Sequence, residues 1–165
     1  MKRLSFVALL FGSLFSWLSC SQKKMPEGEL VRVEFTRSGT MAGYEYEGRV
    51  SQDSTGAFVL RAMKKYYGPL FEKKLDKEAM KHFRQIIEEE KMYQYKEAYL
   101  PRMEVLDGWG WSFNAKFSDG SSIYSHGSNA TPNGDGLGRI QGYMEELIAD
   151  GVQIEFPEED DITAE

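Results

Sequence analysis

Strict alternation of apolar and polar residues predicts strands with one buried face in the first half of the chain. The run 31–36 alternates in this way, and 44–47 does so again after a glycine-containing loop. The apolar positions of the first run are Val31, Val33 and Phe35. Residues 57–63 follow a turn and predict a third strand. Because the connections are too short for a parallel crossover, we expect an antiparallel meander.

Two later stretches carry apolar residues at helical spacing. Asp76 is a good N-cap, and five apolar residues behind it share one face of a helix of roughly four to five turns: Ala79, Met80, Phe83, Ile86 and Ile87. The preceding segment 64–75 is ambiguous, with a turn at Gly68-Pro69. A second apolar series predicts a helix that runs to about Ala149, with Gly151 as a left-handed C-cap: Leu137, Ile140, Met144, Leu147 and Ile148.

A long strand over 109–117, a turn at 118–121 and a short strand over 122–126 lie between the two helices. A glycine-rich loop over 127–138 leads into the second helix. The order βββαββα predicts an α+β domain: a single antiparallel sheet of about five strands with two helices packed on one face. We expect the 109–117 strand at the centre of the sheet, because it carries the largest apolar area.

The first twenty residues form a separate unit. Lys2 and Arg3 precede an apolar run of roughly 16 residues, which is shorter than the ~20 that a membrane-spanning helix needs. The run ends at Leu18-Ser19-Cys20, and Cys20 is the only cysteine of the chain. This leader resembles a bacterial lipoprotein signal peptide, although Trp17 stands where the usual lipobox has a branched apolar residue. The alternative is an ordinary signal peptide with an incidental cysteine.

The resemblance implies a location and an anchor. In lipoproteins, Cys20 would be the first mature residue and would carry acyl chains such as palmitate, which hold the protein to a membrane. A residue other than Asp after the cysteine, here Ser21, implies the outer membrane of a Gram-negative cell envelope. The expected organisation is a signal peptide over 1–19, a lipidated Cys20 with a tether over 20–29, one domain over 30–155, and an acidic disordered tail over 156–165.

Charge and composition narrow the function classes. The full chain has a net charge of −6, and removing Lys2 and Arg3 with the leader leaves 18 basic and 26 acidic residues, or −8. An acidic domain of this kind is a poor partner for nucleic acid or an anionic surface. A single cysteine excludes an internal disulfide, and two histidines far apart predict neither a metal site nor a cofactor.

The segment 111–132 contains two further motifs, Phe117-Ser118-Asp119-Gly120 and Gly127-Ser128-Asn129-Ala130-Thr131-Pro132. This pattern resembles small domains of uncharacterised function in bacterial envelope lipoproteins. The resemblance implies no catalytic residues. In physical terms, Asp-Gly makes a turn, and the Ser, Asn, Thr and Pro residues set up the entry to the second helix.

One catalytic arrangement can be assembled from the polar residues of the hairpin. His126 would act as a general base, with Asp119 to orient it and Ser125 beside it, as in an envelope hydrolase. No nucleophile-elbow motif accompanies the three residues, and polar hairpins contain such sets by chance. We therefore keep this function as the alternative, with a purely structural lipoprotein as a third class, and we expect the protein not to be an enzyme.

The aromatic residues point instead to a binding module. Trp109 lies beside two glycines, and Tyr95 and Tyr99 lie near the end of the first helix. Such rings stack on sugars or anchor a protein partner, whereas the alternative is that they fill the core. Three loop residues add oxygen ligands but lack the closing carboxylate of a calcium loop: Asn129, Asn133 and Asp135. We predict a lipid-anchored envelope protein that binds a protein partner or a glycan.

Overall fold

The computed structural model describes residues 23–39, 44–65, 68–103, 105 and 108–156, and confirms the α+β class. The described helices are α1 (Lys77–Glu89) and α2 (Gly136–Leu147), each followed by a 3₁₀ turn, η1 (Met92–Gln94) and η2 (Ile148–Asp150). The described strands are β1 (Leu30–Ser38), β2 (Tyr44–Gln52), β3 (Phe58–Lys64), β4 (Leu70–Leu75), β5 (Ala98–Tyr99), β6 (Gly110–Phe117), β7 (Ser122–Ser128) and β8 (Val152–Ile154).

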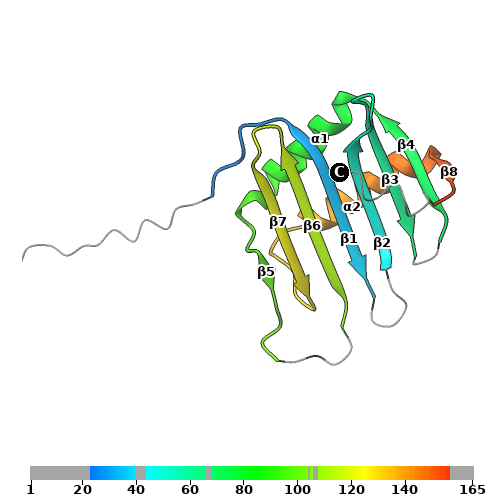
Figure 1. Ribbon diagram of the computed structural model, residues 1–165. Coiled ribbons are helices and arrows are strands. Elements are labelled where there is room, and N and C mark those ends of the chain that lie inside the picture. The colour runs from blue at the N-terminus through cyan, green and yellow to red at the C-terminus, as the bar shows by residue number, and fades with distance from the viewer. Residues whose placement is uncertain (1–22, 40–43, 66–67, 104, 106–107, 157–165) are drawn as a thin grey trace, which may run out of the picture.

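All eight described strands form one sheet in the order β5-β7-β6-β1-β2-β3-β4-β8 (Figure 1). The predicted meander is correct and extends through β4, the segment that the sequence left ambiguous. The expectation of about five antiparallel strands is wrong, because β5 pairs in parallel with β7 and the sheet is therefore mixed. Strands β5 and β8 have only two and three residues, too few to show an alternating pattern.

The centre of the sheet also differs from the prediction. Strand β1 lies between β6 and β2, so β1 and β2 are central and β6 is the third strand from the β5 edge. Within β1 the register shifts between Leu30 and Arg32. As a result, Leu30, Val33 and Phe35 are buried, whereas Val31, which the alternation had placed with them, is only half-buried.

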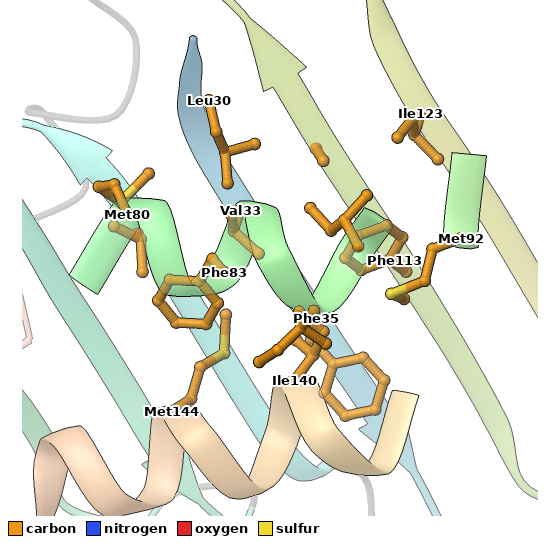
Figure 2. Close-up of a cluster of buried hydrophobic side chains, with 14 of the residues drawn as sticks. Leu30, Val33, Phe35, Met80, Phe83, Met92, Phe113, Ile123, Ile140 and Met144 are labelled. Carbon is orange, nitrogen blue, oxygen red and sulfur yellow. The ribbon is translucent and has the colours of Figure 1, made fainter. Parts of the chain in front are cut away.

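Both helices cover the same face of the sheet (Figure 1). Figure 2 shows Phe83 from α1, Ile140 and Met144 from α2, and Phe113 from β6 meeting in one core, and all four side chains are fully buried. The five apolar residues predicted for the buried side of α1 are all buried. Burial of a large aliphatic or aromatic side chain contributes about 1.5–3 kcal/mol, so this layer stabilises the packing of both helices on the sheet.

Helix ends follow the sequence at one position and depart from it at another. Asp76 is the N-cap of α1, as predicted, and its Oδ1 accepts a hydrogen bond from the Ala79 amide at 2.8 Å. The helix has 13 residues, fewer than the expected four to five turns. Gly151 is not a left-handed cap, since its φ is −68°; the chain leaves α2 through η2, where the Gly151 amide bonds to the Ile148 carbonyl.

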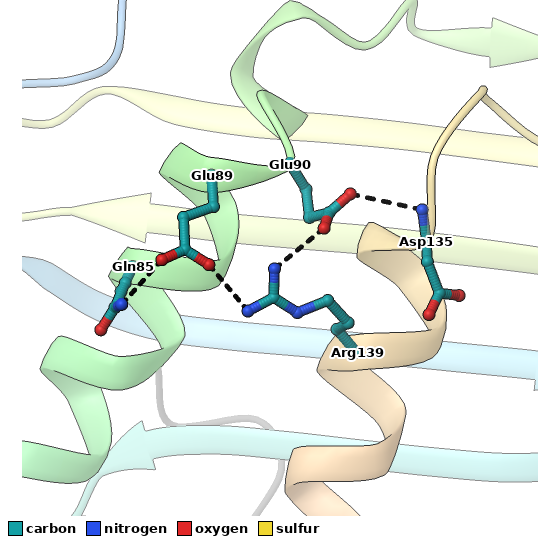
Figure 3. Close-up of polar contacts among 5 residues, drawn as sticks. All are labelled: Gln85, Glu89, Glu90, Asp135 and Arg139. Atoms are coloured by element: carbon teal, nitrogen blue, oxygen red, sulfur yellow. Dashed lines mark hydrogen bonds and ion pairs between the residues drawn. The ribbon is translucent and has the colours of Figure 1, made fainter.

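A salt-bridged clamp joins the two helices (Figure 3). Arg139 of α2 donates to Glu89 at 2.8 Å and to Glu90 at 2.9 Å, at the C-terminal end of α1. Glu90 also accepts a hydrogen bond from the Asp135 amide at 3.3 Å. The clamp therefore fixes the first turn of α2 and the loop before it against α1.

The segment 23–29, predicted as a tether, lies against the domain; we call it the strap. Arg84 of α1 donates to the carbonyls of Pro26 and Gly28, and the Gly28 amide donates to Asp119 at 2.8 Å. Met25 packs against the core. Contacts between the strap and the rest of the described chain therefore begin at Lys23.

The predicted signal peptide, Cys20 and Ser21 fall outside the described residues, as does the tail after Phe156. Within the described part of the chain, no helix has the length and apolar character needed to cross a membrane.

Candidate functional site

A cleft of about 230 Å³ lies where β1 and β6 meet the start of α2. We call it the Trp109 cleft. Its floor is aromatic, with Phe35, Trp109 and Trp111, and its rim comes from the loop 131–135 and the first two turns of α2. Trp109 and residues of this loop were predicted to bind a ligand, and the fold brings them together.

Strand pairing places a cation beside the aromatic floor. Arg37 of β1 pairs in register with Trp111, and Ser38 pairs with Gly110, so the end of β1 lies next to the chain that carries Trp109. The guanidinium carbon of Arg37 lies 5.8 Å from the centre of the Trp109 ring, within the range of a cation–π contact. Glu45 lies 3.5 Å from the Arg37 Nε atom.

Trp111 forms the fixed part of the floor. It is 5% exposed, and its Nε1 donates to the Ala130 carbonyl at 2.7 Å. The indole lies so close to Gly127 that a Cβ there would be 2.4 Å from Trp111 Nε1. Glycine at 127 is therefore what lets the ring reach Ala130. This matches the expectation that Trp111 belongs to the core.

Asn129 holds the backbone of Trp109 in place. Its amide N–H donates to the Trp109 carbonyl at 2.9 Å, and its side-chain Oδ1 accepts from the Trp109 amide at 3.1 Å. Asn129 has a φ of +49°, a left-handed conformation that Asn adopts more readily than most residues. Asn129 is thus a positioning residue: it sets where the Trp109 ring lies and need not touch a ligand.

The polar rim of the cleft comes from the start of α2. Asp135 precedes the helix, but its side chain makes no capping hydrogen bond. Its carboxylate lies against Gly138, where a Cβ would be 2.4 Å from Oδ1. Gln141 adds an amide one turn further along. Asp135, Gln141 and Arg37 give the cleft hydrogen-bonding groups of both kinds around an apolar floor.

Other predicted binding residues lie elsewhere. Tyr95 is buried, and burial raises the pKa of its phenol to about 12, with Glu90 adding to the effect. Tyr99 is half-buried and packs 5.8 Å from the Trp111 ring, so it supports the floor from behind. Asn133 is exposed and does not line the cleft. Of the predicted set, Trp109 and Asp135 line the cleft and Asn129 positions Trp109.

The three residues of the hydrolase alternative are not brought together. Ser125 is fully buried and donates to the Lys96 carbonyl at 2.7 Å. His126 follows it in β7 and therefore points to the opposite face of the sheet. Asp119 lies in the turn beyond the other end of β7, and four residue steps along the strand, about 13 Å, lead from Ser122 to His126.

Asp119 and Ser125 form hydrogen bonds that hold the fold together, whereas one ring nitrogen of His126 has no partner among the described residues. Asp119 accepts hydrogen bonds from Ser121 and Gly28, which lower the pKa of its carboxyl group. Among the described residues, His126 Nδ1 is buried and has no hydrogen-bond partner, so no carboxylate holds the ring through that atom. This arrangement offers no support for general-base catalysis at His126. The described residues also contain no group of three or more His, Cys, Asp or Glu side chains that could hold a metal ion.

A larger groove, of about 660 Å³, runs beside the strap and the start of α1. Three of its polar residues already have partners: Asp76 caps α1, Lys81 pairs with Glu78, and Arg84 holds the strap. A ligand there would have to replace these contacts. The Trp109 cleft is the better candidate, because the Asp135 carboxylate makes no capping hydrogen bond to α2 and the Trp109 indole is partly exposed.

Sequence reasoning missed Arg37, Phe35 and Gln141 as parts of the cleft. Arg37 and Phe35 continue the alternation of the first strand and read as ordinary strand residues. Only the pairing of β1 with β6, which are 72 residues or more apart along the chain, places them beside Trp109. No family model, curated protein or solved structure matches the chain.

Proposed function

We propose that this chain is a lipid-anchored protein of the cell envelope whose domain binds an envelope glycan in the Trp109 cleft. The observation that carries the proposal is the convergence of the Trp109 ring, the Arg37 guanidinium and the Asp135 carboxylate on one cleft. An indole face packs on the apolar face of a sugar ring, while neighbouring charged and amide groups bond to its hydroxyls.

The size of the cleft limits the ligand. Pockets for drug-sized ligands and cofactors measure ~300–1,000 Å³, so a cleft of about 230 Å³ is too small for most of them. It fits one sugar ring, with the rest of a glycan chain outside. A protein partner would instead insert a single side chain, and it is the competing outcome in the experiment below.

The membrane anchor is the second part of the proposal. It is supported by the leader before Cys20, with its basic start and short apolar run. Mass spectrometry of the N-terminal peptide from the membrane fraction should find acyl chains on Cys20. The Cys20→Ser variant should fold normally and leave the membrane fraction. Retention of that variant in the membrane would contradict the anchor.

The chain offers a direct optical test of binding. Its three tryptophans are Trp17, Trp109 and Trp111, so a chain without the leader carries tryptophan only at the cleft. Titration with soluble fragments of the envelope glycan should change the intrinsic fluorescence saturably. The Trp109→Ala variant should bind at least about tenfold more weakly, the loss expected when a central aromatic contact is removed.

Tyr124→Ala is the matched control. Tyr124 is an exposed aromatic residue of β7 and lies outside the Trp109 cleft, so its removal should leave the affinity unchanged. Equal losses in the two variants, or no saturable response in the wild type with any glycan fragment, would contradict glycan binding in the cleft. Recovery of an envelope protein that depends on Trp109 would replace the glycan with a protein partner.

A further inference from the structure

The contacts of the strap shorten the free chain between the proposed anchor and the domain. Lys23 Nζ donates to the Tyr95 carbonyl at 2.9 Å, at the residue where η1 ends. Lys23 is the third residue after Cys20, and an extended chain of three residue steps spans at most about 11 Å. An anchor on Cys20 is therefore tied to the neighbourhood of Tyr95, and the domain cannot stand far from the bilayer.

The rest of the strap is fixed at several points. The carbonyls of Pro26 and Gly28 accept from Arg84, the Gly28 amide donates to Asp119, and Ser118 and Glu29 exchange two hydrogen bonds at 2.8 and 2.9 Å. A Cβ at Gly28 would lie 2.7 Å from the Asp119 amide nitrogen, so this close contact depends on glycine. Without the strap contacts, the free chain would run from Cys20 to Leu30 and span about 35 Å.

Four lysines lie around this attachment point, although the chain as a whole is acidic and Glu90 and Glu97 adjoin two of them in the sequence. Lys23 and Lys24 begin the strap, Lys96 follows Tyr95, and Lys91 precedes η1 within one turn of Tyr95. All four lysines are exposed, and we call them the lysine surface. Lysine side chains close to a membrane are attracted to anionic headgroups within a Debye length of about 8 to 10 Å.

We propose that the strap seats the domain on the bilayer with the lysine surface against anionic lipid headgroups. This inference rests on the proposed lipid anchor at Cys20, and adds to it an orientation and a lipid preference. The occupant of this surface is the membrane itself, because the chain between Lys23 and the anchor is too short to admit another layer. Acyl chains supply the attachment, while the lysines and the strap set the angle.

The orientation can be tested without depending on natural lipidation. The chain from Cys20 to Glu165 contains every residue that the structure describes, and Cys20 is its only thiol. It can be coupled to a maleimide lipid in vesicles of phosphatidylethanolamine and phosphatidylglycerol. A membrane-impermeant amine reagent, read by mass spectrometry, then reports the accessibility of each lysine. The reference is the same chain with a blocked thiol among the same vesicles.

Lys91 and Lys96 are the informative positions, because Lys23 and Lys24 lie close to the anchor in any orientation. We expect both to lose most of their labelling when the chain is coupled. Lys74 of β4 is the internal control: it is exposed, and six strand spacings, about 29 Å, separate its strand from β5. Labelling of Lys91 and Lys96 that matches the blocked reference would overturn the inference.

A strap-release variant tests the cause. Lys23→Ala combined with Arg84→Ala and Asp119→Ala removes the side-chain contacts that hold Lys23, Pro26 and Gly28 to the domain. Lys81→Ala on the same helix as Arg84 is the control, because within the described part of the chain Lys81 is hydrogen-bonded to Glu78 and makes no hydrogen bond to the strap. Release should restore labelling of Lys91 and Lys96 while the protein stays on the vesicles. Equal protection in the released and control variants would overturn the role of the strap. Absence of natural acylation, measured separately on the full chain, bears on the anchor proposal and leaves this geometric result unchanged.

Discussion

The two ends of β1 differ in how far their surroundings are closed by contacts with other segments. At the Leu30 end the strap lies against the domain, and its backbone is hydrogen-bonded to Arg84, Asp119 and Ser118. At the Arg37 end the Trp109 cleft is left open, with an indole that is partly exposed and a carboxylate that does not cap its helix. The nine residues of the strand put the two ends roughly 30 Å apart.

The same kind of hydrogen bond, from a backbone amide to a side-chain oxygen, occurs at both ends but has different roles. Asp119 at one end and Asn129 at the other each accept a hydrogen bond from a distant backbone amide through a side-chain oxygen. Asp119 thereby fixes the entry of the chain, whereas Asn129 fixes the backbone of an aromatic residue in the cleft. One end is therefore an attachment point and the other a recognition site, and substitutions should affect the two separately.

The largest effect should come from the floor of the cleft. Trp111→Ala removes a nearly fully buried ring and its hydrogen bond to Ala130, so the free energy of unfolding should fall by about 3–5 kcal/mol. Urea denaturation measures the change. Tyr124→Ala, which removes an exposed ring, should cost less than about 1 kcal/mol. Similar losses in the two variants would show that Trp111 does not belong to the core.

An intermediate effect is expected at Asn129. Asn129→Ala removes two roles at once, the hydrogen bond to Trp109 and the tolerance of a positive φ, and should cost about 1–2 kcal/mol. Asn129→Gly keeps the backbone conformation and loses only the bond. Both variants should weaken glycan binding, but glycine should be the more stable of the two in thermal unfolding. If the alanine and glycine variants are equally stable, backbone strain at the positive φ of residue 129 does not contribute to the loss of stability.

A smaller effect is expected when the strap is loosened. Arg84→Ala removes two partly exposed hydrogen bonds, each worth ~0.5–1.5 kcal/mol, and should lower the free energy of unfolding by about 1 kcal/mol. Its main consequence should be local: residues 23–29 should exchange amide hydrogens and be cleaved by proteases faster. Glycan affinity should not change. A variant that loses affinity would show that the two ends are coupled.

The smallest effect should be the pH dependence of the strap. Hydrogen bonds from Ser121 first, and then from Gly28, lower the pKa of Asp119 below its ordinary value of 3.8. A lowered folded-state pKa means that the carboxylate stabilises the fold above the ordinary value, and that this contribution is lost as the pH falls through the folded-state pKa. Proteolysis of the strap should therefore increase below about pH 4. Asp119→Asn should abolish this dependence.

Sequence reasoning succeeded where the determining contacts are local. Asp76 caps α1, the five apolar residues behind it are all buried, and the short connections give the β1–β4 meander. It failed where distant segments meet. Strand β8 is formed by three residues that pair with β4, and β5 by two residues that pair with β7, so neither has a pattern of its own.

In the candidate site, too, residues with a local sequence signal were predicted and residues brought in by distant contacts were not. Trp109 stood out because of the glycines beside it, and Asp135 because of its loop. Arg37 and Gln141 join them only through the pairing of β1 with β6 and the packing of α2, which no local pattern encodes. The strap was predicted as a tether because its composition is polar. Composition alone does not predict that the side chains of Arg84 and Asp119 form hydrogen bonds with the strap backbone.

The most direct test of the cleft compares two identical substitutions in α2. Gly138→Ala would displace the Asp135 carboxylate at the rim of the cleft, whereas the Cβ of Gly142→Ala meets nothing within 4 Å. Both should stabilise the helix, by up to about 1 kcal/mol. In the fluorescence titration with glycan fragments, we predict that Gly138→Ala weakens binding while Gly142→Ala binds as the wild type does. Equal affinities for the two variants would contradict binding in the Trp109 cleft.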